Sequence, residues 1–106
     1  MAAGLQKQYG LYINGEWVDA SDGSTFKSFN PATGEELAVC AEATKEDVDA
    51  AVKAAKAAFK TWKNISPIER QQYLLKIADI IDQNLHHLAL VDTLDNGTPI
   101  RDTTPL

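Results

Sequence analysis

The chain has 106 residues, which is enough for one domain at most. Its 10 basic and 15 acidic residues are interspersed, giving a net charge of -5 without the basic cluster that nucleic-acid binding requires. No signal-peptide pattern or membrane-spanning apolar run is present, and Cys40 is the single cysteine, so we expect a soluble cytoplasmic protein from a reducing compartment.

The first elements in chain order are a disordered lead-in and a hairpin. Residues 1–10 are small and polar, without a periodic pattern. Leu11–Ile13 and Trp17-Val18 are β-prone and flank Asn14-Gly15, the dipeptide that best tolerates the positive φ angles of a tight turn. The sequence therefore predicts a β-hairpin centred on Asn14-Gly15.

A second hairpin is predicted next. Thr25–Phe29 is β-prone, and Asn30–Gly34 combines the fixed φ of Pro31 with a glycine exit, which is typical of a turn. Leu37–Ala41 then alternates in the period of a half-buried strand.

The second half of the chain has helical periodicity. Thr44 and Asp47 form a capping-box pattern at the start of a first helix, whose many alanines would let another element approach closely. Lysines lie opposite its apolar stripe. The stripe consists of Val48, Ala51, Val52, Ala55, Ala58, Phe59 and Trp62.

A second helix is predicted from Ser66–Glu69, another capping-box pattern, with Pro67 in the first helical position. We expect a bend or a junction between helices at Asn84, a left-handed cap at Gly97, and a stop at Pro99. The order is thus β-β-β-β-α-α, two hairpins followed by two amphipathic helices. The second apolar stripe consists of Leu74, Ile77, Ala78, Ile81, Leu85 and Leu88.

Few residues offer catalytic or metal-binding chemistry. Cys40 lies in a predicted strand with no histidine nearby in sequence, and we interpret it as a packing residue. His86 and His87 are adjacent, so both rings cannot share one helix face, and we expect them on an exposed surface. The six glycines form no dinucleotide-binding or phosphate-binding pattern.

Asp95 has two interpretations. A carboxylate at a helix end is unfavourable unless something compensates its charge. Asp95 therefore either caps nearby backbone N–H groups or contributes to an oxygen-rich site for a monovalent cation, together with backbone carbonyls from a neighbouring loop.

Four segments together resemble the N-terminal region of NAD(P)-dependent aldehyde dehydrogenases. They occur in the order and at the distances of that family, and the resemblance covers about residues 11–106. The segments are Tyr12–Trp17, Asn30–Glu35, Asp47–Phe59 and Leu94–Gly97.

The resemblance implies an α/β fold in which residues 11–106 are the incomplete N-terminal portion of a Rossmann-like NAD-binding domain. In this family a cysteine attacks the aldehyde to form a thiohemiacetal, hydride passes to NAD or NADP, and a glutamate activates water. Cys40 matches neither catalytic position, and no catalytic or cofactor-binding residue of the family maps onto this chain. No cofactor is therefore expected to bind the chain alone.

One site does map by resemblance. In some members a monovalent cation is bound by the residue matching Asp95, through its carboxylate, and by those matching Ser28 and Phe29, through backbone carbonyls. The remaining ligands would come from other parts of the enzyme.

We therefore expect a fragment of an aldehyde dehydrogenase that is inactive alone and whose partner is the remainder of that enzyme or another subunit. The alternative is a non-catalytic interaction module that associates through exposed apolar helix faces, with itself, a dehydrogenase subunit or another partner. A third interpretation is an independent α+β domain in which the hairpins cover the helices.

Overall fold

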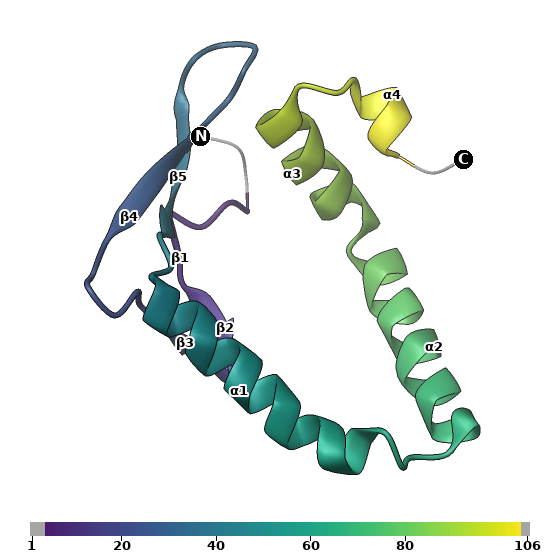
Figure 1. Cartoon of the computed structure of the whole chain (residues 1–106). Helices are drawn as coiled ribbons and strands as arrows, with labels where there is room; N and C mark the ends of the chain where they lie inside the picture. Colours follow the sequence, from purple (N-terminus) through teal and green to yellow (C-terminus); the bar gives the residue numbers. More distant parts are fainter. Residues whose placement is uncertain (1–3, 105–106) are drawn as a thin grey trace. The chain divides into compact units, whose positions relative to one another are not determined.

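Within residues 4–104, which the computed structural model describes, five strands are followed by four helices (Figure 1). The strands are β1 (Gln8–Tyr9), β2 (Leu11–Ile13), β3 (Glu16–Val18), β4 (Thr25–Phe29) and β5 (Glu36–Ala41). The helices are α1 (Lys45–Trp62), α2 (Pro67–Gln83), α3 (Leu85–Asn96) and α4 (Ile100–Thr103). The α/β class and the order of strands before helices agree with the sequence.

The first hairpin forms as predicted. Strands β2 and β3 pair antiparallel as a separate two-stranded sheet, with Ile13 opposite Glu16. Asn14 and Gly15 make the turn with φ angles of 53° and 79°. Positive φ at both central residues is the requirement that makes this dipeptide common in two-residue hairpin turns.

A three-stranded sheet in the order β1-β5-β4 contains the second predicted hairpin. The turn between β4 and β5 is closed by hydrogen bonds from Asn30 N–H to the Glu35 carbonyl and from Gly34 N–H to the Asn30 carbonyl. Gly34 has a φ of 77°, as the turn prediction requires.

Strand β1 corrects the prediction that residues 1–10 are a disordered lead-in. Gln8 and Tyr9 pair parallel with Val39 and Cys40 of β5. Two residues carry too little periodicity to predict a strand, and the pairing partner lies far along the chain. Residues 1–3 fall outside the described part, so the prediction stays open there.

The helices start at the predicted caps. Thr44 and Asp47 form a complete capping box on α1. Ser66 accepts a hydrogen bond from Glu69 N–H at α2, with Pro67 in the first turn; this is the hydroxyl half of the second predicted box. Each cap satisfies a backbone N–H that has no partner inside the helix.

The second predicted helix is divided at Asn84, the expected junction. Asn84 has φ and ψ of -113° and 17°, and its side-chain amide donates to the Ile80 carbonyl at 2.8 Å. Gly97, with a φ of 83°, caps α3 in the left-handed conformation. The short α4 after Pro99 was not predicted, because four residues are too few to show helical periodicity.

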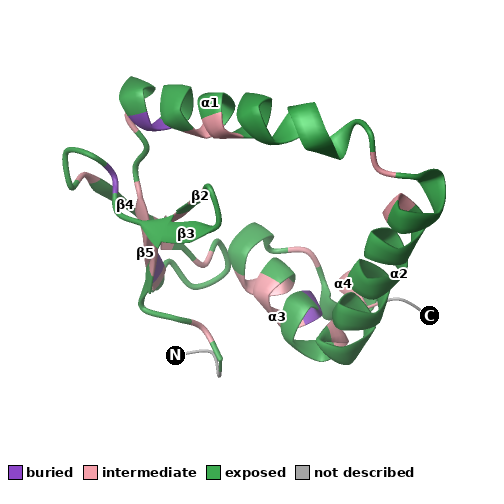
Figure 2. Ribbon diagram, turned by 90° about the horizontal axis from the view of Figure 1, so that it is seen from below, coloured by how far each residue is buried: buried purple, intermediate pink, exposed green. Residues whose placement is uncertain are grey.

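The described residues divide into two compact units, one of which holds Gln6–Ser28 and Ala38–Asn64. Among the described hydrophobic residues only Ala20, Ala38 and Ala89 are buried. The large apolar side chains of α1 and α2 are exposed, as the colouring of these helices in Figure 2 shows. None of the described helices is long and apolar enough to cross a membrane.

Candidate functional site

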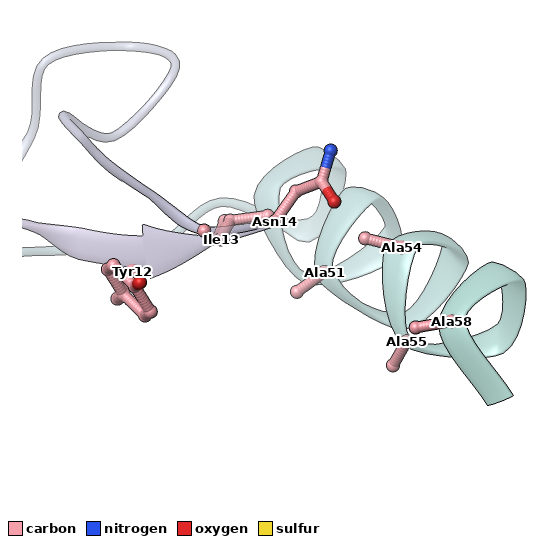
Figure 3. Close-up of a pocket in the computed structure, with 8 residues that line it drawn as sticks. Tyr12, Ile13, Asn14, Ala51, Ala54, Ala55 and Ala58 are labelled. Carbon is pink, nitrogen blue, oxygen red and sulfur yellow. The ribbon is translucent and has the colours of Figure 1, made fainter. Parts of the chain in front are cut away.

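A shallow groove lies between the first hairpin and α1. Its volume is about 370 Å³. Figure 3 shows the tip of the hairpin beside the alanines of α1, where small side chains allow the close approach predicted from the sequence. The lining residues are Tyr12, Ile13, Asn14, Gly15, Ala51, Ala54, Ala55 and Ala58.

The groove does not fit a dinucleotide cofactor. A pyrophosphate is bound by backbone N–H groups at a helix N-terminus or by cationic side chains. The groove lies along the middle of α1, and its lining includes no charged residue. Its apolar walls and single amide, that of Asn14, suit a packing contact better than an anion.

A second cluster connects the start of α1 to the loop after β3. The Asp47 carboxylate accepts hydrogen bonds from Thr44 N–H at 2.9 Å and from Ser21 N–H at 3.0 Å. Ser21 Oγ lies 2.8 Å from Thr44 Oγ1. The backbone N–H groups of Thr44 and Ser21 hold the pKa of Asp47 below its ordinary value of 3.8, because they stabilise the ionised form.

This cluster is structural in character. Asp47 is the buried polar residue of the described chain. Its carboxylate holds the backbone N–H groups of Ser21 and Thr44 in place. The sequence predicted the bond to Thr44 from its spacing. Ser21 was missed because a partner 26 positions away leaves no local signal.

The residues considered for chemistry lie on different elements. Cys40 is a free, partly buried thiol in β5, opposite Tyr9 of β1. His86 and His87 lie in the first turn of α3 and are both exposed, as predicted. Among the described residues, no three His, Cys, Asp or Glu side chains are grouped so as to hold a metal ion.

The predicted cation ligands lie at two element ends. Asp95 is in the last turn of α3, exposed, and Phe29 ends β4 in the same compact unit. Ser28 precedes Phe29 and belongs to the other unit. Asp95 and Ser28 both take part in polar interactions. The cation site remains a prediction from the sequence.

Comparison with known proteins decides the family. The model of the aldehyde dehydrogenase family matches residues 17–105, which is most of the chain. The chain belongs to the aldehyde dehydrogenase family. The resemblance that the four segments indicated is thereby confirmed.

Individual relatives agree with this assignment. DhaS of Bacillus subtilis (strain 168) is 46% identical over 102 residues, which are 94% of this chain and 21% of that protein. Aldehyde dehydrogenase 1 of Tanacetum cinerariifolium is 47% identical over 93 residues, covering 86% of this chain and 19% of that protein. The chain thus spans about a fifth of the length of the curated relatives it matches.

Solved aldehyde dehydrogenases share the fold. The NAD+ complex of the enzyme from Bacillus cereus superimposes with a TM-score of 0.87 at 44% identity, over 93% of this chain and 21% of that one. The strands and helices described above are therefore a recurring part of a larger family fold, consistent with the N-terminal part that the motifs indicate.

Proposed function

We propose that this chain is the N-terminal portion of the NAD-binding domain of an NAD(P)-dependent aldehyde dehydrogenase, a cytoplasmic enzyme that oxidises an aldehyde to a carboxylic acid. Family membership over residues 17–105 supports the proposal. So does the likeness to the solved NAD+ complex of the aldehyde dehydrogenase from Bacillus cereus. The part played by these residues is structural, since none maps onto the family's catalytic positions.

The observation that carries the proposal is the exposure of the apolar helix faces. In α1, Val52 is 56% and Phe59 is 58% exposed, and in α2 Leu74 is 67% exposed. These side chains belong to the stripes predicted from the sequence, and burying one stabilises a fold by about 1.5–3 kcal/mol. Such faces are suited to covering a sheet supplied by the remainder of the enzyme.

The chain alone is expected to be inactive. Hydride transfer requires a nucleophile, a base, oxyanion donors and the cofactor in one fixed arrangement. Cys40 lies in the middle strand of the β1-β5-β4 sheet, paired with β1, where its role is packing.

A spectrophotometric assay tests this expectation. The purified chain is mixed with NAD or NADP and short aliphatic aldehydes, and formation of the reduced nicotinamide is followed. We expect no rate above that of buffer. A rate that disappears in the Cys40→Ser variant would overturn the structural role proposed for this residue.

Reading the DNA that follows the Leu106 codon tests the larger proposal. We expect coding sequence for the remainder of an aldehyde dehydrogenase, in the same frame or as a neighbouring gene. Unrelated sequence on that side would remove the support for an enzyme portion.

The same exposed faces favour one alternative, an interaction module that binds a complete dehydrogenase subunit or another copy of itself. Size-exclusion chromatography with light scattering separates the two. A stable complex with an intact aldehyde dehydrogenase subunit favours the module. A monomer that binds no such subunit argues against it.

We also propose that the Asp95 carboxylate and the backbone carbonyls of Ser28 and Phe29 contribute to a monovalent-cation site. Hard cations prefer such oxygen ligands. The support is the resemblance of these residues to the family's cation ligands, within the stretch of residues 17–105 that the family model matches.

Titration with Na⁺ or K⁺, at constant ionic strength set with choline chloride, tests the cation site by NMR. We expect saturable shifts of the Phe29 and Asp95 amide signals, lost in Asp95→Asn and kept in Asp92→Asn, a matched carboxylate on the same helix. Equal responses in both variants would contradict the site.

A further inference from the structure

We propose that the Asn14-Gly15 turn is a site of spontaneous covalent modification, at which Asn14 loses its side-chain amide and becomes aspartate or isoaspartate. Two asparagines in the chain precede a glycine, Asn14 and Asn96. The structure places them in opposite environments, and this difference makes the modification selective for Asn14.

The chemistry needs water alone. The backbone nitrogen of Gly15 attacks Cγ of Asn14, a C–N bond forms, and the bond from Cγ to the amide nitrogen breaks. The Gly15 proton passes through solvent to the leaving group, which departs as ammonia. Water then opens the resulting five-membered succinimide at either carbonyl, giving aspartate or isoaspartate without any change of oxidation state.

The surroundings of Asn14 permit this attack. Both turn residues are exposed, and no described atom outside Asn14, Gly15 and Glu16 lies within 4 Å of the position that a Cβ would take on Gly15. Among the described residues, the Asn14 side-chain amide has no hydrogen-bond partner. The amide is therefore free to rotate toward the Gly15 nitrogen.

The backbone at this turn also opens easily. Strands β2 and β3 have three residues each and form a sheet of their own. An isolated two-stranded hairpin is marginally stable in water. Although β2 contacts α1, the turn at Asn14 and Gly15 is exposed, so local opening there costs little free energy. The turn can therefore leave its native φ and ψ and reach the geometry of attack.

Asn96 and Gly97 are constrained by hydrogen bonds and by packing. The Asn96 amide nitrogen donates to Asp92 Oδ1 at 2.7 Å, and its oxygen accepts from Thr98 N–H at 2.7 Å. The Gly97 nitrogen, which would be the nucleophile, donates to the Thr93 carbonyl at 3.0 Å. A Cβ on Gly97 would lie 3.0 Å from Pro31 Cγ, so the glycine is closely packed as well.

Asp22-Gly23 could form the same succinimide, but more slowly. Asp22 Oδ1 accepts from Ser24 N–H at 2.9 Å, and this bond holds the pKa of the Asp22 carboxyl below its ordinary value of 3.8. The group is therefore ionised at neutral pH, and a carboxylate is a poor electrophile. The Gly23 nitrogen is also engaged, donating to the Ala20 carbonyl at 2.8 Å.

Modification of Asn14 would change the groove beside α1. A carboxylate would replace the single amide of a wall otherwise built from Tyr12, Ile13, Gly15 and alanines (Figure 3). Isoaspartate also adds a methylene to the backbone of a two-residue turn, which disturbs the register that the turn sets.

Peptide mapping by mass spectrometry tests the proposal. The folded chain is incubated at mildly alkaline pH, digested, and searched for the mass increase that results when an amide NH₂ becomes OH. We expect Asn14 to react at least about tenfold faster than Asn96. Asn96 must first break a hydrogen bond, and the free energy of one such bond changes a rate by about that factor. In concentrated urea the two rates should converge.

Two variants complete the experiment. Asn14→Gln, which disfavours the five-membered ring, should remove most of the acidic product, whereas Asn96→Gln should leave it unchanged. Chromatographic separation of the Asn14 peptide should yield both aspartate and isoaspartate forms. Equal rates at Asn14 and Asn96 in the folded chain, or no modification at Asn14, would overturn the proposal.

Discussion

At the scale of single residues, Asp47 connects the start of α1 to the loop after β3 through hydrogen bonds. Its carboxylate accepts from the backbone N–H groups of Thr44 and Ser21, and these bonds lower its pKa. A carboxyl whose pKa is lower in the folded state stabilises the fold above its unfolded pKa, here 3.8. That contribution is lost as the pH falls below 3.8 through the folded pKa.

We therefore expect the melting temperature to decline as the pH is lowered past 3.8, and part of this decline to be absent in Asp47→Asn. Thermal unfolding followed by circular dichroism at several pH values measures both slopes. Asp49→Asn is the matched control, since Asp49 is exposed and, within the described part of the chain, pairs only with Lys45 along the same helix. Identical slopes for wild type and Asp47→Asn would contradict the argument.

Residue roles were predictable where they depend on sequence spacing. The capping box, the two turn residues Asn14 and Gly15, and the left-handed Gly97 each have local physical causes. The bond from Ser21 to Asp47 was not predictable, because it depends on how the chain folds back over 26 positions. The cation ligands Ser28, Phe29 and Asp95 came from family resemblance rather than from physical pattern.

At the scale of elements, glycines determine where strand β2 and helix α3 end. Gly15 and Gly97 have φ angles of 79° and 83°, which cost a residue with a Cβ about 1–2 kcal/mol. Their surroundings differ, since a Cβ meets open space at Gly15 and lies 3.0 Å from Pro31 Cγ at Gly97.

We expect Gly97→Ala to destabilise the chain more than Gly15→Ala does. The first variant bears the backbone strain and the contact with Pro31, whereas the second bears only the strain. Chemical denaturation of both variants gives the comparison, and Pro31→Ala combined with Gly97→Ala should recover part of the loss. An equal effect of both glycine substitutions would show that the contact with Pro31 is unimportant.

Elements marked by a local turn or cap residue were predicted well, and short elements without such a residue were not. The first hairpin, the start of α1 and the division at Asn84 follow from turn and cap residues. Strand β1 and helix α4 have two and four residues, too short for a hydrophobic period to appear. Both depend on neighbours elsewhere in the chain, β5 for the strand and α3 for the helix.

At the scale of the whole molecule, the apolar stripes predicted on α1 and α2 are present, but their large side chains are exposed to solvent. Sequence periodicity predicts which face of a helix is apolar without specifying what covers it. For α1 and α2 the covering partner is proposed here to be the remainder of an aldehyde dehydrogenase. Until such a partner is supplied, the exposed faces should make the chain prone to bind apolar molecules and to associate with itself.

Substitution of one stripe residue tests this last expectation. Leu74, 67% exposed on α2, lies on the apolar face, and Leu74→Lys should weaken both self-association and the fluorescence of a bound apolar dye such as anilinonaphthalene sulfonate. Gln72→Lys, which adds the same charge to the opposite, polar face of the same helix, is the control and should change neither property. Light scattering over a concentration series measures association. If both variants behave alike, net charge rather than the apolar face governs how the chain associates.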